Sequence, residues 1–310
     1  MSARTTALIG AFGWLAFSLP ETPNVHHGIW GQVLVQFAAL VLVPLLFAVA
    51  QDGETRALAW ARRLQLPAAL ALVVAFGFDA GVAAAALAAP WAGVLLLAAI
   101  DGGLRALRGG ERSAGRWCRE AGLLFAAVGA AWLMADRAGI RPLGFSDDIV
   151  LLTAVHFHYA GLLLPVLAGE ALDCWGRRRA ANAIATGVIA GVPAVAIGIT
   201  AAQCGLGWQG EMVAALLMAA SGTAVAGVHV ALGLDGRWPV GVRCLWVAAG
   251  CSLAAGMALA ALYGLRGVIA PWPWLDIPWM RALHGSVNAL GFGLCGTLAW
   301  WRLAELKRRR

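Results

Sequence analysis

The feature that most constrains the fold of this chain is a series of long, uninterrupted apolar runs. Ten such runs can be drawn along the 310 residues, at about 5–20, 28–50, 64–88, 90–106, 119–137, 149–171, 181–203, 209–233, 239–264 and 281–303. A bilayer leaves only helices and closed barrels for a spanning backbone, because unpaired backbone polar groups are too costly in lipid. Barrel strands would alternate in polarity, whereas these runs are continuous and mostly long enough for membrane helices.

The composition supports the same class. Hydrophobic residues make up 61% of the chain and charged residues only 13%, whereas about a quarter of the residues in a soluble domain are charged. We therefore expect an all-α, polytopic transmembrane bundle that forms a single domain over residues 1–310. Its expected partner is the lipid bilayer.

The basic residues lie mainly in short loops between the apolar runs, which indicates membrane orientation and not nucleic-acid binding. With the N-terminus inside, the outer loops hold only Arg137, Arg141, Arg266 and Arg281 of the 23 Lys and Arg residues. Cytoplasmic loops carry such an excess of positive charge. We expect about ten helices with both termini cytoplasmic, in a multi-pass protein of the bacterial inner membrane. No A-x-A cleavage site follows the first run, so we expect that helix to be retained.

Familiar soluble-enzyme motifs are missing from the sequence. The six cysteines form no CxxC pair, which argues against a thiolate zinc site or a disulfide framework. No P-loop, GxSxG, HExxH or CxxCH motif occurs. ATP-driven pumping, serine hydrolysis, zinc-peptidase chemistry and c-type haem attachment therefore lack sequence support.

Polar side chains gather toward the outer side of the predicted bundle. Five of the six histidines fall there: His26, His27, His156, His158 and His284. His156 and His158 lie roughly 10–14 Å below the outer boundary at 1.5 Å per residue. The sixth, His229, lies inward, and we interpret it as an interhelical hydrogen bond.

Helical geometry separates the two histidines of the sequence VHFHYAG. In a regular helix, at about 100° per residue, His156 and His158 point roughly 200° apart and cannot bind one metal. His156 shares a polar stripe with Thr153 and Tyr159. His158 faces a stripe of small or kinking residues. It is interpreted either as a second ligand or as a side chain that makes a hydrogen bond where two helices pack.

The last run carries a matching stripe of His284 and Asn288, one helical turn apart. An outward-opening site built by the second, sixth and tenth runs is the functional interpretation. His26 or His27, His156 and His284 would supply imidazoles to a metal ion or haem, or to a proton relay. The alternative is that these histidines only make hydrogen bonds between helices.

Two carboxylates in or near the predicted helices can also be interpreted as either functional or structural. Asp79, in the sequence GFDAG, is placed a little outward of the midplane, where a carboxylate is paired, protonated or functional. A proton-handling role is the first interpretation for it. Asp101, near the inner end of the fourth run, is interpreted as a solvated ion pair.

Two motifs support a family resemblance. HFHYAG (156–161) and MRALHGSVNALGF (280–292) together resemble the YndJ-like family of bacterial membrane proteins, over about residues 140–300. The resemblance implies a location in the membrane and an architecture. It implies no molecular activity. HFHY alone is similar to a helix of haem–copper oxidase subunit I, which would make His156 and His158 candidate axial ligands. The chain departs from that family elsewhere, with ten predicted helices instead of at least twelve and no His-Pro-Glu-Val motif.

Three functions remain open from the sequence. The first is a metal- or haem-dependent membrane enzyme or redox protein, with His156, His158 and His284 as ligands or acid–base groups supported by Tyr159, Asn288 and Asp79. The second is a proton-coupled transporter or permease that uses the same side chains. The third is a structural or assembly factor with no site. Neither the cofactor nor a small-molecule substrate can be named.

Overall fold

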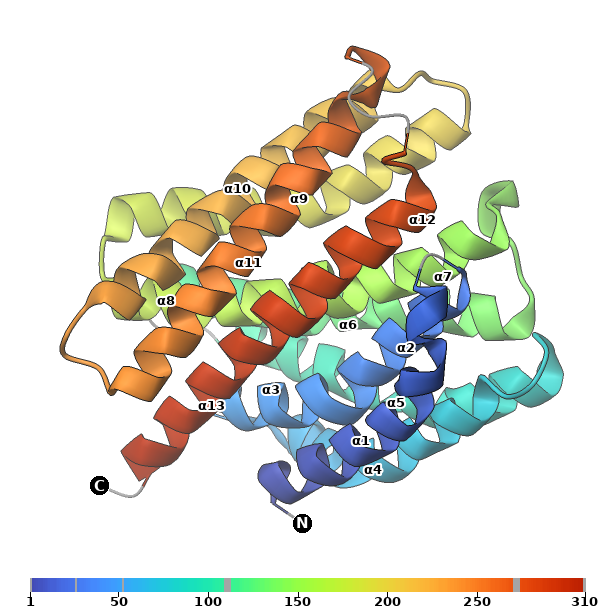
Figure 1. Cartoon of the computed structure of the whole chain (residues 1–310). Helices are drawn as coiled ribbons and strands as arrows, with labels where there is room; N and C mark the ends of the chain where they lie inside the picture. Colours follow the sequence, from blue (N-terminus) through green and yellow to red (C-terminus); the bar gives the residue numbers. More distant parts are fainter. Residues whose placement is uncertain (1, 26, 52, 109–112, 270–273, 309–310) are drawn as a thin grey trace. The chain divides into compact units, whose positions relative to one another are not determined.

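The computed structural model describes residues 2–25, 27–51, 53–108, 113–269 and 274–308, and within them every regular element is helical. Figure 1 shows the chain coloured along its sequence. The elements are α1 (Ala3–Ser18), η1 (Leu19–Asn24), α2 (Ile29–Phe37), η2 (Ala38–Leu42), α3 (Val43–Val49), α4 (Arg56–Ala75), α5 (Val82–Leu107), α6 (Ala114–Ala138), η3 (Pro142–Gly144), α7 (Asp147–His156), η4 (Phe157–Leu163), α8 (Leu164–Trp175), α9 (Arg178–Gln203), α10 (Gln209–Leu234), α11 (Val240–Gly264), η5 (Leu265–Gly267), α12 (Ile277–Trp279), η6 (Met280–Gly285), η7 (Val287–Gly293) and α13 (Leu294–Arg308).

The all-α, multi-pass prediction is confirmed. Eight helices within the described residues are long and apolar enough to cross a membrane: Ile29–Val49, Arg56–Ala75, Val82–Leu107, Ala114–Ala138, Asp147–Trp175, Arg178–Gln203, Gln209–Leu234 and Val240–Gly267. The first and tenth predicted runs are also helical, as α1 and as the stretch from α12 to α13. The cytoplasmic placement of both termini stays a prediction.

The chain folds as two compact units. The first comprises Met1–Glu111 and Arg119–Val166, and the second comprises Arg112–Cys118 and Leu167–Arg310. The interpretation of the whole chain as one membrane domain stays a prediction.

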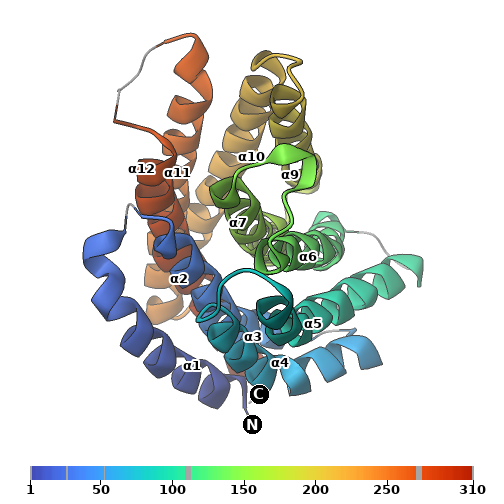
Figure 2. The same cartoon turned by 90° about the vertical axis from the view of Figure 1, so that its right-hand side faces the viewer.

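In the first unit, α2, η2 and α3 form one continuous helix that its neighbours enclose. Its most apolar window is 94% buried, and α1, α4 and α7 pack against it (Figure 2). The Trp14 indole of α1 donates to the Val33 carbonyl at 2.9 Å, and its ring lies 4.6 Å from that of Phe37. Gly10 lets α1 approach closely, because a Cβ there would collide with the Leu40 carbonyl.

The second unit contains α9, α10 and α11 as a series of neighbouring helices, with the last helix against α11 (Figure 1). Small residues permit these close approaches, as is common between membrane helices. A Cβ on Gly250 would lie 2.7 Å from the Ala226 carbonyl oxygen, and one on Gly198 would lie 2.7 Å from Glu211 Cα. These glycines therefore fix how closely the α11–α10 and α9–α10 backbones meet.

Candidate functional site

Three helices of the described chain contain π-helical stretches, and four of the eight predicted site residues lie in them. The stretches are η2, η4, η6 and η7. His158 and Tyr159 lie in η4, His284 lies in η6, and Asn288 lies in η7, while His156 immediately precedes η4. π-Helical turns are rare and occur frequently at functional sites.

A π-helical stretch begins directly after His156. A π-helix makes i→i+5 hydrogen bonds, so its rotation per residue is somewhat smaller than the roughly 100° of an α-helix. Positions i and i+2 still point to nearly opposite faces, and the expectation that His156 and His158 serve separate sites stays a prediction. The order of apolar residues contains no signal for this change of winding.

His158 is a fully hydrogen-bonded side chain of the first unit. Its Nδ1 lies 2.8 Å from the Ala154 carbonyl oxygen, and the Trp91 indole donates to its Nε2 at 3.1 Å. A carbonyl only accepts and an indole N–H only donates, so His158 is neutral with its proton on Nδ1. Both ring nitrogens are thus engaged, and an axial metal bond would displace Trp91. The geometry supports the helix-packing alternative for His158.

Tyr159 bridges two helices of the first unit. Its hydroxyl donates to the Leu34 carbonyl oxygen at 2.8 Å. The sequence places Thr153 and His156 on the same polar stripe as Tyr159. The Thr153 hydroxyl, unlike that of Tyr159, donates within its own helix, to the Ile149 carbonyl oxygen at 2.7 Å. His156 itself is half-buried at the end of α7.

His229 repeats the arrangement of His158 in the second unit. Its Nδ1 lies 3.0 Å from the Val225 carbonyl oxygen, and the Trp300 indole donates to its Nε2 at 3.3 Å. His229 and Trp300 belong to α10 and α13, so the predicted interhelical hydrogen bond is confirmed. Each unit therefore holds one buried histidine between an i−4 carbonyl and an indole.

His284 and Asn288 form a different kind of pair in the second unit. His284 Nδ1 donates to the Gly256 carbonyl oxygen of α11 at 2.8 Å. The Asn288 amide nitrogen donates to the His284 carbonyl at 2.9 Å and lies 3.3 Å from both ring nitrogens. Within the described chain, the buried Asn288 Oδ1 has no hydrogen-bond partner.

Gly256 makes the close approach of this pair possible. A Cβ on Gly256 would lie 2.5 Å from both terminal atoms of the Asn288 amide. The His284 proton on Nδ1 leaves the Nε2 lone pair available, with the Asn288 amide nitrogen as its near neighbour. The pair thus combines His284 Nε2, a base, with Asn288 Oδ1, a hydrogen-bond acceptor without a partner among the described residues. The two residues lie on consecutive π-helical stretches.

The expected position of Asp79 within a helix is wrong. Asp79 lies in the exposed turn between α4 and α5. The helix starts at Arg56, where the Thr55 hydroxyl caps it by accepting the Ala57 N–H, and it ends at Ala75. Its charged first turns resemble a loop in sequence, so the predicted run began too late and extended too far.

Asp101 is also placed differently from the expectation of a solvated ion pair. Its carboxylate is fully buried, accepts the Thr55 backbone N–H at 2.7 Å and pairs with Arg105 at 2.6 Å. Arg105 in turn donates to the Ala50 carbonyl at 2.8 Å. The pair therefore joins α5 to the segment that precedes α4.

The metal interpretation finds no support in the described residues, where no three His, Cys, Asp or Glu side chains are arranged to hold a metal ion. His26 lies outside the described residues, and His27 is exposed just before α2. His156 belongs to the first unit and His284 to the second. Their participation in one site stays a prediction.

Comparison with known proteins identifies relatives without an assigned activity. The chain is 29% identical over 189 residues to the uncharacterized membrane protein YndJ of Bacillus subtilis (strain 168), which covers 60% of this chain and 32% of that protein. The matched part therefore spans about a third of the relative's length. No solved structure matches the chain. A family model described as YndJ-like protein matches residues 33–292, which include both motifs, and the chain therefore belongs to the YndJ-like family.

Proposed function

We propose that this multi-pass membrane protein is a proton-coupled transporter in which His284 and Asn288 handle the proton. The observation that carries the proposal is the half-buried His284–Asn288 pair on consecutive π-helical stretches. Irregular helices within the membrane are typical of transport sites, because a departure from regular i→i+4 hydrogen bonding can free backbone groups for a solute.

The chemistry of the pair suits reversible proton transfer. Histidine is the side chain whose ordinary titration lies between pH 5 and 8, and intramembrane histidines mark proton relays in pumps and transporters. The Gly256 carbonyl fixes the ring through Nδ1, so that Nε2 is the nitrogen that gains and loses the second proton. Asn288 Oδ1, which has no partner among the described residues, can accept a hydrogen bond from a polar solute.

The tautomer of His158 weighs against the haem alternative. As an axial ligand it would have to give up the bond from Trp91, which closes its Nε2 at 3.1 Å. Leaving a buried indole N–H unpaired costs about 1–3 kcal/mol. We therefore favour transport over a haem- or metal-dependent enzyme.

Proton flux in vesicles tests the proposal. The purified chain would be reconstituted into liposomes that contain a pH-sensitive dye, and a potassium gradient with valinomycin would drive proton entry. We expect entry faster than in protein-free vesicles, and its loss in both His284→Ala and Asn288→Ala. Ser221→Ala is the matched control, because it removes another polar side chain of the same unit, whose hydroxyl only bonds to the Leu217 carbonyl of its own helix.

Two results would contradict the proposal. One is a wild-type rate equal to that of empty vesicles over a range of pH. The other is a stoichiometric metal in the purified protein that is lost in His284→Ala, which would favour the metal-dependent enzyme.

We further propose that the protein lies in the bacterial inner membrane with both termini in the cytoplasm. The support is the asymmetric distribution of Lys and Arg between the two sets of loops.

A further inference from the structure

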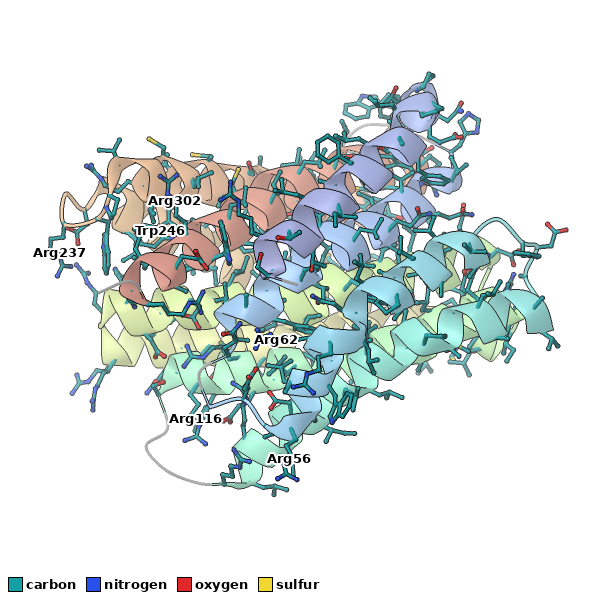
Figure 3. All side chains as sticks on the ribbon, turned by 90° about the horizontal axis from the view of Figure 1, so that it is seen from below. Arg56, Arg62, Arg116, Arg237, Trp246 and Arg302 are labelled. Carbon is teal, nitrogen blue, oxygen red and sulfur yellow. The ribbon has the colours of Figure 1, made fainter. Side chains whose placement is uncertain are left out.

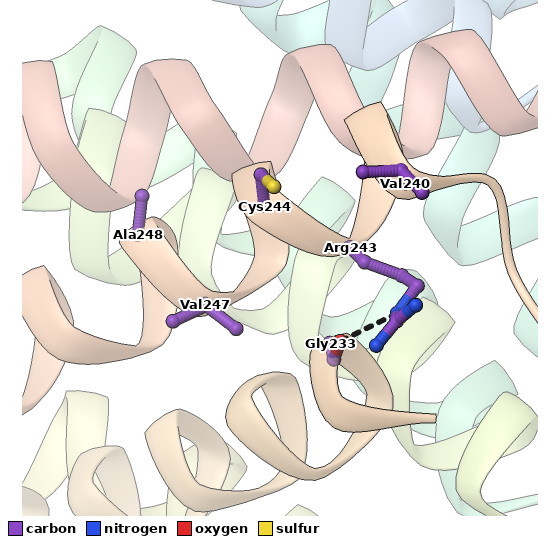
Figure 4. Close-up of a pocket in the computed structure, with 6 residues that line it drawn as sticks. All are labelled: Gly233, Val240, Arg243, Cys244, Val247 and Ala248. Atoms are coloured by element: carbon purple, nitrogen blue, oxygen red, sulfur yellow. Dashed lines mark hydrogen bonds between the residues drawn. The ribbon is translucent and has the colours of Figure 1, made fainter. Parts of the chain in front are cut away.

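A groove opens on the second unit where α10 ends and α11 begins (Figure 4). It has a volume of about 410 Å³ and is lined by Gly233, Val240, Arg243, Cys244, Val247 and Ala248. This volume falls within the roughly 300–1,000 Å³ that is typical of small-molecule sites. Its wall is apolar apart from the single guanidinium of Arg243.

Arg243 is held in the groove by one backbone contact. Its Nε donates to the Gly233 carbonyl oxygen at 2.9 Å (Figure 4). The described residues offer no hydrogen-bond partner to its two Nη groups. These groups are therefore available to a ligand while the guanidinium is fixed in orientation, and an arginine fork of this kind suits a phosphate.

The surroundings of the groove are positively charged. Arg237 lies in the α10–α11 loop, and Arg302 of the last helix lies on the same side of the unit (Figure 3). The Arg302 Nη1 atom would be 3.4 Å from a Cβ on Gly241, at the start of α11. The nearby Asp235 carboxylate is already bound by Arg237, through Nε at 2.9 Å and Nη2 at 2.6 Å. Neither Arg243 nor Arg302 has an ion-pair partner in the described part of the chain.

We propose that this groove binds an anionic phospholipid, with the headgroup phosphate on Arg243 and the first part of an acyl chain along Val240, Val247 and Ala248. An apolar wall next to a guanidinium matches the polarity of a phospholipid from headgroup to chain. Basic pockets between membrane helices bind anionic headgroups for this reason. A free phosphate would gain nothing from the valine side chains, and a zwitterionic headgroup would bring a second cation to an arginine-rich surface. The proposal is independent of the proton-handling pair.

Native mass spectrometry of the full chain in detergent tests the lipid site. The two probes would be dioleoylphosphatidylglycerol and dioleoylphosphatidylcholine, which share their acyl chains and differ in net charge. We expect the anionic lipid to bind about tenfold more tightly, and Arg243→Gln to abolish this preference, since charge-assisted hydrogen bonds contribute at least that factor. Arg4→Gln in α1 is the control for the change of net charge, and it should keep the preference.

A second variant keeps the test valid if Arg243→Gln does not fold. Ala248→Trp fills the groove without changing the charge, so it should weaken the binding of both lipids. Equal binding of the two lipids to the wild type would overturn the proposal, as would an unchanged preference in a folded Arg243→Gln. Displacement of the anionic lipid by an equal concentration of glycerol phosphate would show a site for phosphate alone and would also overturn it.

Discussion

The Trp91 indole N–H donates to His158 Nε2 at 3.1 Å, and the planes of the two rings lie 11° from parallel with their centroids 6.3 Å apart. The contact joins α5 to the π-helical stretch η4 within the first unit. The contact fixes the tautomer of His158, for which the sequence alone allows a role as a ligand.

Replacing Trp91 by phenylalanine should destabilise the protein. The substitution removes the donor and leaves the buried Nε2 of His158 unpaired, at an expected cost of about 1–2 kcal/mol, because hydrogen bonds between membrane helices are worth somewhat less than in water. Thermal unfolding in detergent measures the effect. The control is Trp60→Phe at a side chain that is 52% exposed, and an equal loss in both variants would contradict the assigned role.

A methyl group on Gly256 should disrupt the His284–Asn288 pair. The Cβ of Gly256→Ala would lie 2.5 Å from the Asn288 amide, so α11 and the last helix must separate or the amide must turn away. We expect a loss of about 1–3 kcal/mol in stability from this overpacking, together with loss of proton flux. Gly227→Ala in α10 is the matched control, because nothing lies within 4 Å of its added Cβ. Proton flux in Gly256→Ala equal to that of the wild type would separate the pair from transport.

Breaking the buried pair of Asp101 and Arg105 should cost much more than breaking an exposed one. Asp101→Asn leaves a buried guanidinium without its counter-charge, which typically costs about 3–5 kcal/mol. Glu54→Gln removes the carboxylate that pairs with Arg62 at 2.9 Å, where both side chains are about one-third exposed, and should cost at most about 1 kcal/mol. Chemical denaturation of both variants gives the comparison. Similar losses would mean that Asp101 is solvated after all.

The proposed orientation predicts that Cys204 is accessible from the periplasmic side of the inner membrane. Cys204 is exposed in the turn after α9. A variant that retains only this cysteine should react with a membrane-impermeant maleimide in intact cells, and a variant that retains only the buried Cys118 should not. Labelling of Cys204 only after lysis would reverse the orientation.

The α10–α11 loop should show a shifted carboxylate titration. Hydrogen bonds from Arg237 lower the pKa of Asp235 below its ordinary value. This interaction therefore stabilises the loop fully above the ordinary pKa near 3.9, and the stabilisation is lost as the pH falls through the lowered one. A carboxyl-carbon NMR titration measures the midpoint, and Arg237→Gln should restore it toward the ordinary value. An equal midpoint in both proteins would show that the contact is absent in solution.

The helices were largely predictable because apolar runs and loop charges are local properties of the sequence. Two features could not be predicted from these local properties. The start of α4 carries Arg56, Arg62 and Arg63, so hydropathy alone displaced this helix and placed Asp79 inside the membrane. The π-helical winding of η4 and η6 left no pattern in the apolar residues.

The candidate site was predictable as a set of residues and not as a set of contacts. The interhelical bond of His229 was correctly predicted, because an imidazole inside a bundle needs a polar partner. The order of residues could not indicate that Trp91, 67 positions away, makes the same kind of bond to His158. Which helices become neighbours depends on packing, and packing decides which histidine keeps a lone pair.

The helix from Ile29 to Val49 has the highest mean hydropathy of the eight spans, 2.4, and its most apolar window is also the most enclosed, at 94% buried. In the finished protein, its apolar side chains are therefore surrounded mainly by protein and not by lipid. Its high hydropathy matters during biogenesis, when the segment enters the bilayer before its neighbours have closed around it. A single charge placed there would thus act at two stages, first by preventing insertion and afterwards by disturbing the core.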